Sequence, residues 1–83
     1  MYAVIFKPSA VKHLERLPKL AQRRIVRAIE ELADDPRPAG CVKLVGEDNL
    51  WRIRVGSYRV VYSIEDDDLL VLILRVAHRK DAY

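Results

Sequence analysis

Hydrophobic and polar positions follow two different periods along this chain of 83 residues. The segment "YAVIF", residues 2–6, is a short apolar run rich in β-forming residues, and it predicts a strand that is buried on both faces. Apolar residues then recur at helical spacing up to about residue 33, and after residue 40 they alternate as in strands. The predicted order is a strand, a helical region and a run of strands.

The helical region divides into two helices at Pro18, which ends the first helix and suits the first turn of the second. The first helix opens at Pro8 or Ser9, and the pair predicts a tight αα-hairpin. Each helix carries one apolar stripe that we expect to face the core. The stripe residues are Ala10, Leu14 and Leu17 in the first helix and Ala21, Ile25, Ala28, Ile29 and Leu32 in the second.

After a Pro-interrupted loop at residues 34–40, the segments "CVKLVG", "LWRIRV", "YRVVYSI" and "LLVLILRVAH" show strand patterns. The last segment is apolar enough to predict a central strand buried on both faces. We therefore expect residues 1–83 to form a single α+β domain. In this domain a strand and an αα-hairpin precede a mostly antiparallel sheet, and the helical pair packs on one face of that sheet.

The dipeptide Gly56-Ser57 predicts a two-residue hairpin turn with glycine first, and this turn places Arg54 opposite Arg59. Like charges directly opposite each other destabilise a strand pair by up to about 1 kcal/mol. The pairing therefore indicates a site for an anion, and the alternative is that long arginines decorate a solvated sheet face. By alternation, one face carries Trp51, Ile53, Val55, Tyr58, Val60, Tyr62 and Ile64, and the other carries Arg52, Arg54 and Arg59.

The register of the last strand stays open because it depends on the turn "EDDD". A loop of even length places Arg59 on the same face as Leu74 and His78. An odd loop or a β-bulge instead places it with Arg75 and Arg79.

Composition adds two expectations. The 15 Lys and Arg residues exceed the 12 Asp and Glu residues, and the net charge of +3 is compatible with an anionic partner. The single cysteine excludes an internal disulfide, and neither a signal peptide nor a membrane-spanning run is apparent, so we expect a soluble cytoplasmic protein without a membrane partner.

Two motifs resemble a known family. Residues 54–62 read R-x-G-x-Y-R-x-x-Y, and the ending "HRKDAY" reads H-R-x-x-x-Y. With these motifs, almost the entire chain resembles the RelE/ParE superfamily of bacterial and archaeal type II toxins, specifically its RelE branch. The resemblance implies a small metal-independent endoribonuclease that cuts mRNA in the ribosomal A site through attack of the 2′-OH on the scissile phosphate. It also implies a RelB-like antitoxin that neutralises the toxin and through which the complex binds its own operator DNA.

The resemblance also implies the site residues. Arg52 and Arg54 match the basic residues of the first hairpin strand, and Arg59 matches the phosphate-binding arginine of the next strand. Arg79 and Tyr83 match the C-terminal pair of the family. Arg59 and Arg79 are expected to stabilise the charge on the phosphate, and Tyr83 to stack on a base or orient the 2′-OH.

One departure from the family pattern concerns the general base. Several members carry lysine where this chain has Arg52 and Arg54, and arginine does not lose its proton as lysine can. His78 is the titratable candidate, with a structural role as the alternative. No cofactor or metal is expected, because the histidines and the cysteine lack ligand spacing and residues 66–68 indicate a solvated turn.

Two other functions stay open beside RNA cleavage. A ParE-like toxin of the same fold would inhibit DNA gyrase without cutting RNA. A catalytically inactive homologue would only bind its antitoxin.

Overall fold

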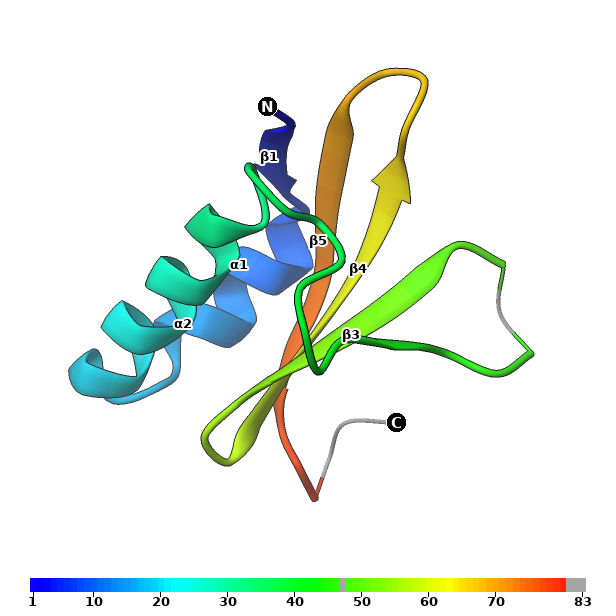
Figure 1. Cartoon of the computed structure of the whole chain (residues 1–83). Coiled ribbons are helices and arrows are strands. Elements are labelled where there is room, and N and C mark those ends of the chain that lie inside the picture. The colour runs from blue at the N-terminus through cyan, green and yellow to red at the C-terminus, as the bar shows by residue number, and fades with distance from the viewer. Residues whose placement is uncertain (47, 81–83) are drawn as a thin grey trace.

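The sheet has five strands in the order β1-β5-β4-β3-β2, as the computed structural model of the chain shows (Figure 1). The structure describes residues 1–46 and 48–80. The pairing of β1 with β5 is parallel, and the other three pairings are antiparallel, so the predicted mostly antiparallel sheet is confirmed. The strands are β1 (Ala3–Phe6), β2 (Val42–Lys43), β3 (Leu50–Val55), β4 (Tyr58–Glu65) and β5 (Leu70–His78).

The two helices, α1 (Pro8–Glu15) and α2 (Lys19–Glu31), pack on one side of the sheet (Figure 1). Pro18 caps the start of α2, and its carbonyl accepts the backbone N–H of Gln22 at 3.0 Å. The Gln22 side chain donates to the carbonyl of Leu17 at 2.7 Å, and this hydrogen bond stabilises the connection between the two helices. The predicted αα-hairpin is confirmed. Of the helices in the described residues, none has the length and apolar character needed to cross a bilayer.

The core lies between the helices and the sheet. The apolar stripes predicted from the sequence face it, because Ala10, Ile25, Ile29 and Leu32 are buried. Burying one such aliphatic side chain stabilises the fold by about 1.5–3 kcal/mol, with less for alanine. The sheet contributes Ile53, Val60, Tyr62, Ile64, Val71, Ile73 and Val76.

Two predictions of burial on both faces were wrong. In β1, Ile5 is 50% exposed, because β1 is an edge strand and the helices cover only one side of the sheet. In β5, Val71 and Ile73 are buried under the helices, whereas Leu72 and Leu74 on the other side are only half-buried. An apolar run on its own does not reveal that the second face has no covering layer.

The segment "CVKLVG" forms a shorter strand than its alternation predicts. Only Val42 and Lys43 pair with β3. The chain then turns away at Leu44, whose N–H donates to the carbonyl of Leu50 at 2.9 Å. As a result, β2 is a short edge strand beside the arginine-bearing hairpin.

Candidate functional site

The turn between β3 and β4 determines which side chains share a face of the sheet. Gly56 has a φ of 60°, and Ser57 does not have a positive φ, which is the pattern of a type II′ hairpin turn. Arg54 lies opposite Arg59, and the ladder continues in the same register along all of β3. The register predicted for this hairpin is therefore confirmed.

The two faces of the hairpin differ in their surroundings. On the side of the helices, Ile53 is 7% exposed and Val60 is fully buried. On the opposite side, which we call the open face, Arg54 is exposed while Arg52 and Arg59 are half-buried. The open face therefore holds the three arginines outside the core.

A β-bulge in the β4–β5 ladder decides which residues of β5 share the open face. The register shifts between Val61 and Tyr62, so that the ladder skips Leu74 and places Arg75 opposite Val61. Arg59 consequently shares its face with Arg75. Of the two registers that the sequence left open, the structure has the bulged one.

The end of β5 lies next to the hairpin turn. The backbone N–H of Arg79 donates to the carbonyl of Ser57 at 2.7 Å and extends the ladder by one residue. The Arg79 side chain is exposed, and alternation along the strand assigns it to the same face as Arg59. The structure thus brings Arg79 to the sheet end that carries Arg54. Tyr83 lies outside the described residues.

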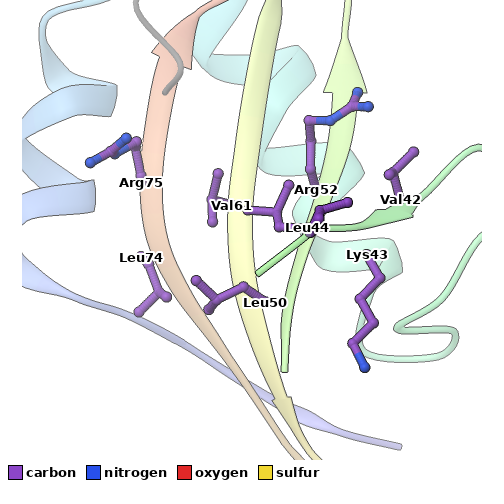
Figure 2. A pocket seen from close by; sticks show the side chains of 9 residues that line it. Val42, Lys43, Leu44, Leu50, Arg52, Val61, Leu74 and Arg75 are labelled. Atoms are coloured by element: carbon purple, nitrogen blue, oxygen red, sulfur yellow. The ribbon is translucent and has the colours of Figure 1, made fainter. Parts of the chain in front are cut away.

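A groove with a volume of about 650 Å³ crosses the open face. Figure 2 shows Val61 in the middle of this groove, with Arg75 on one side of it and Arg52 on the other. Leu50 and Leu74 add apolar surface, and Val42, Lys43, Leu44 and Val45 complete the lining. Arg75 was not among the predicted site residues, because its face depends on a bulge that the sequence does not reveal.

Neither histidine of the chain lies on the open face. His78 is opposite Tyr58 on the helix side, and the two rings meet edge to face with centroids 5.5 Å apart. His13 in α1 is half-buried and accepts the backbone N–H of Val76 on Nδ1 at 3.4 Å. The structure therefore does not bring His78 together with the arginines.

Asp66, in the β4–β5 turn, joins separate segments at the other end of the sheet. The Arg37 guanidinium donates to both carboxylate oxygens, at 3.2 and 2.9 Å, and the Tyr2 hydroxyl donates to Oδ1 at 2.6 Å. The hydrogen bond from Arg37 lowers the pKa of Asp66, and the hydrogen bond to Asp66 raises the pKa of Tyr2. Arg37 also lies 4.9 Å from the ring centroid of Trp51. Asp66 is thus a structural anion in an exposed turn.

The open face suits the recognition of phosphate. Guanidinium groups stay charged at any physiological pH and offer paired N–H donors that match phosphate oxygens. The apolar floor of the groove provides contact for a base or a sugar beside those charges. Within residues 1–46 and 48–80, no group of three His, Cys, Asp or Glu side chains is arranged to hold a metal ion.

Known proteins are similar to this chain in both sequence and fold. The family model described as the ParE toxin of the parDE type II toxin-antitoxin system matches residues 4–83. Toxin RelG of Mycobacterium tuberculosis is 34% identical over 83 residues, which cover 99% of this chain and 95% of the relative. Toxin RelE3 of Methanocaldococcus jannaschii is 33% identical over an alignment of 84 positions, and the alignment covers 96% of this chain and 93% of the relative.

A solved structure agrees with these relatives. The archaeal RelE-RelB complex from Pyrococcus horikoshii contains a chain that is 35% identical and superposes with a TM-score of 0.85, covering 98% of both chains. The family match, the identities and the shared fold together show that the chain belongs to the RelE/ParE superfamily of type II toxin–antitoxin toxins, with similar relatives in its RelE branch.

Proposed function

We propose that this toxin is a ribosome-dependent endoribonuclease, which cuts mRNA in the ribosomal A site and thereby inhibits translation. The observation that carries the proposal is the opposition of Arg54 and Arg59 on an open face whose edge also holds Arg79. Three guanidinium groups at one end of a sheet match the charge of a scissile phosphate and its neighbours.

In the proposed reaction, the 2′-oxygen bonds to the adjacent phosphorus while the bond from phosphorus to the 5′-oxygen breaks. The products are a 2′,3′-cyclic phosphate and a 5′-hydroxyl end. Arg59 and Arg79 stabilise the negative charge that spreads over the phosphate oxygens, and Arg54 and Arg52 hold the strand in place. By family resemblance, Tyr83 stacks on a base or orients the 2′-OH. None of these steps requires a metal ion.

We assign no general base to the open face. An arginine side chain has no acceptor for a proton, so Arg52 and Arg54 cannot fill this role, and His78 packs against Tyr58 on the helix side. In this proposal the proton of the 2′-OH passes to a water molecule, the leaving 5′-oxygen takes a proton from water, and charge stabilisation by the arginines supplies the rate enhancement. His78 then has a packing role.

The partner that we propose is a cognate RelB-like antitoxin, because the matching archaeal RelE structure is a complex with RelB. An acidic or amphipathic antitoxin segment would neutralise the arginines of the open face. We further propose that the toxin–antitoxin complex binds operator DNA through the antitoxin, and that the toxin acts in the cytoplasm on ribosomes and mRNA.

Inhibition of DNA gyrase is the second candidate function. It is favoured by one observation, the match of residues 4–83 to the family model named for the ParE toxin. The two activities use different targets on a shared fold, so they can be separated directly.

The decisive experiment incubates the purified toxin with programmed ribosomes and maps the 5′ ends of the mRNA, with a gyrase supercoiling assay in parallel. We expect new ends within the A-site codon only when ribosomes are present, and unchanged supercoiling. Inhibited supercoiling without cuts would support the gyrase candidate. If neither activity appears while the antitoxin still co-purifies, the chain is a catalytically inactive homologue.

A further inference from the structure

Arg75 and Arg52 flank the same residue of the sheet. Val61 lies opposite Arg52 of β3 on one side and opposite Arg75 of β5 on the other. Because neighbouring strands are about 4.8 Å apart, the backbones of the two arginines are about 10 Å apart. Figure 2 shows their guanidinium groups directed away from each other, with Val61 between the two side chains. The two arginines therefore border the groove from opposite sides and leave its floor open.

The β-bulge in β5 is the reason that Arg75 lies on this face. In a ladder without the bulge, Arg75 would lie opposite Val60 on the side of the helices, where Val60 is fully buried. Because the ladder skips Leu74, Arg75 turns to the open face and is exposed. Bulges are frequent beside active sites, where they redirect a side chain. This bulge adds one more guanidinium group to the face that carries Arg59.

The arginines of the open face form two rows across the strands. Arg54 and Arg59 lie opposite each other in the first row, and Arg52 and Arg75 lie on either side of Val61 in the second. The rows are two residues apart along β4, which is about 6.7 Å. Positive charge therefore continues along the sheet from the first row to the second.

Beyond the second row, the open face changes its character. The third row consists of Leu50, Ser63, Leu72 and Ile5, which pair across four strands and carry no charge. The fourth row contains the acidic Glu65, whose carboxylate accepts the Asn49 side chain at 3.4 Å. The second row is therefore where the cluster of guanidinium groups on this face ends.

We propose that Arg75 is a further substrate-binding residue, which with Arg52 binds the phosphate next to the scissile one. The inference rests on the proposed RNA cleavage, which places the scissile phosphate at Arg54 and Arg59. A single strand that continues along the sheet brings its next phosphate over the second row. Arginine suits this role, because its guanidinium group donates paired N–H groups to phosphate oxygens.

An acidic segment of the antitoxin is the competing ligand of Arg75. The groove also has apolar side chains that such a segment could bury, among them Leu50 and Leu74. Both leucines lie on the side of the second row that faces away from the first row. Arg75 itself lies on the side of the groove that continues into the first row, so the position of the RNA strand in the proposed reaction favours phosphate as its ligand.

The test measures binding of a fluorescein-labelled 2′-O-methyl hexanucleotide, which lacks the attacking hydroxyl, by anisotropy over a range of salt concentrations. Arg75→Gln is compared with Arg16→Gln, which removes the same charge from an exposed position at the end of α1. Arg24 is unsuitable as a control, because its guanidinium lies 3.8 Å from the position that a Cβ on Gly56 would occupy and so borders the hairpin turn.

Loss of one phosphate contact sets the expected size of the effect. We expect Arg75→Gln to bind about fivefold or more weakly at low salt and to lower the salt slope by about 0.7, the value for one contact on a single strand. Arg16→Gln should change the affinity by less than about twofold. Arg75→Lys keeps the charge but not the paired donors, so it should recover the salt slope without the full affinity.

Cleavage on programmed ribosomes supplies a second readout. We expect Arg75→Gln to raise the toxin concentration that gives half of the maximal rate by about fivefold, and to keep the rate at saturation within about threefold. The reason is that Arg75 binds a phosphate that does not react, and such binding is equally strong in the ground state and the transition state. Arg59→Ala should instead lower the rate at saturation.

The outcomes separate this inference from the proposed cleavage. Unchanged RNA binding by Arg75→Gln, or equal weakening by Arg16→Gln, would overturn the inference. Weaker capture of a co-expressed antitoxin with unchanged RNA binding would also overturn it and assign Arg75 to the antitoxin. A melting temperature that falls in parallel with RNA binding would make Arg75 a structural residue. Absence of cleavage by the wild type contradicts the proposed function alone, because the hexanucleotide assay still decides the role of Arg75.

Discussion

Arg54 and Arg59 lie directly opposite each other across the β3–β4 ladder, on the sheet face that the helices leave uncovered (Figure 1). Both neighbours of this pair along the ladder, Val55 with Tyr58 and Ile53 with Val60, are apolar cross-strand pairs on the other face. The like charges therefore meet at a defined position within a well-packed hairpin. An anion bound between them would relieve their repulsion.

Replacing Arg54 should lower activity without harming the fold. We expect Arg54→Ala to reduce ribosome-dependent cleavage by about 100-fold, because it removes one donor to the phosphate. The free energy of unfolding should stay unchanged or rise by up to about 1 kcal/mol, because a like-charge pair is lost from an exposed position. Arg59→Ala should reduce cleavage further. Urea melts with and without added phosphate, together with cleavage assays, measure these effects.

The matched control for Arg54 is its neighbour Ile53 on the buried face. Ile53→Ala should lower the free energy of unfolding by about 2–4 kcal/mol and lose activity only as far as the protein unfolds. A destabilised Arg59→Ala protein with full cleavage activity would show that the arginines are structural and that the active site lies elsewhere.

Replacing His78 tests the absence of a general base on the open face. A general base contributes about 100-fold or more to the rate, so we expect His78→Gln to keep its single-turnover cleavage rate within about threefold. Its free energy of unfolding should fall by about 1 kcal/mol, because the edge-to-face contact with Tyr58 is lost. The control is His13→Gln in α1. A loss of cleavage by His78→Gln of the size expected for a base, with the fold intact, would restore His78 as the base.

The hydroxyl of Tyr62 should stabilise the loop before β2. It is buried and donates to the carbonyl of Pro36 at 2.7 Å, and burial raises the pKa of Tyr62. Tyr62→Phe leaves that carbonyl without its donor, so the free energy of unfolding should fall by about 1–2 kcal/mol. Tyr58→Phe on the same strand is the control, because no hydrogen bond of its hydroxyl is found among the described residues. Equal urea midpoints for the two variants would contradict the role of the bond.

Acid should weaken the Asp66 network. The hydrogen bond from Arg37 lowers the pKa of Asp66, so this stabilisation is complete above the unfolded pKa of about 3.9 and is lost as the pH falls through the lower folded value. Tyr2 behaves in the opposite sense. Its raised pKa gives stability that is complete below about pH 10 and is lost above the folded value.

The variant Asp66→Asn should therefore have a lower melting temperature than the wild type at neutral pH, and the difference should shrink as the pH falls below the unfolded pKa of about 3.9 and disappear below the lowered folded pKa of Asp66. Asp67→Asn, in the same turn, is the control for general charge effects, and its melting temperature should follow the wild type. Thermal melts from acid to alkaline pH provide the comparison. Identical profiles for the two asparagine variants would contradict the assignment.

Local information explains why the hairpin could be predicted in full. Gly56 and Ser57 form a turn of two residues, and such a turn allows one register, so the opposition of Arg54 and Arg59 follows from the sequence alone. The apolar stripe of α2 was equally readable, because helical spacing assigns Ile25 and Ile29 to one face regardless of the rest of the fold.

Contacts between distant segments could not be predicted in this way. The bulge that places Arg75 on the open face results from packing across β4 and β5, and no residue type marks it. The approach of Arg24 to Gly56 and the bonds of Asp66 with Tyr2 and Arg37 each join segments far apart in the chain. The sequence therefore predicted the arginines of the hairpin as a candidate site. It did not predict the groove on the open face, which Arg75 of β5 helps to line.

The placement of β5 between β1 and β4 has a consequence for folding during synthesis. Of the described strands, β1 is hydrogen-bonded to β5 alone. The strand that is synthesised first therefore cannot pair until the strand that is synthesised last is available. Contacts of such high sequence separation form slowly, and until they form the edge of β5 that pairs with β1 stays open and prone to aggregation. A nascent chain can build the αα-hairpin and the β3–β4 hairpin early, but it completes the sheet only after residues 70–78 have left the ribosome.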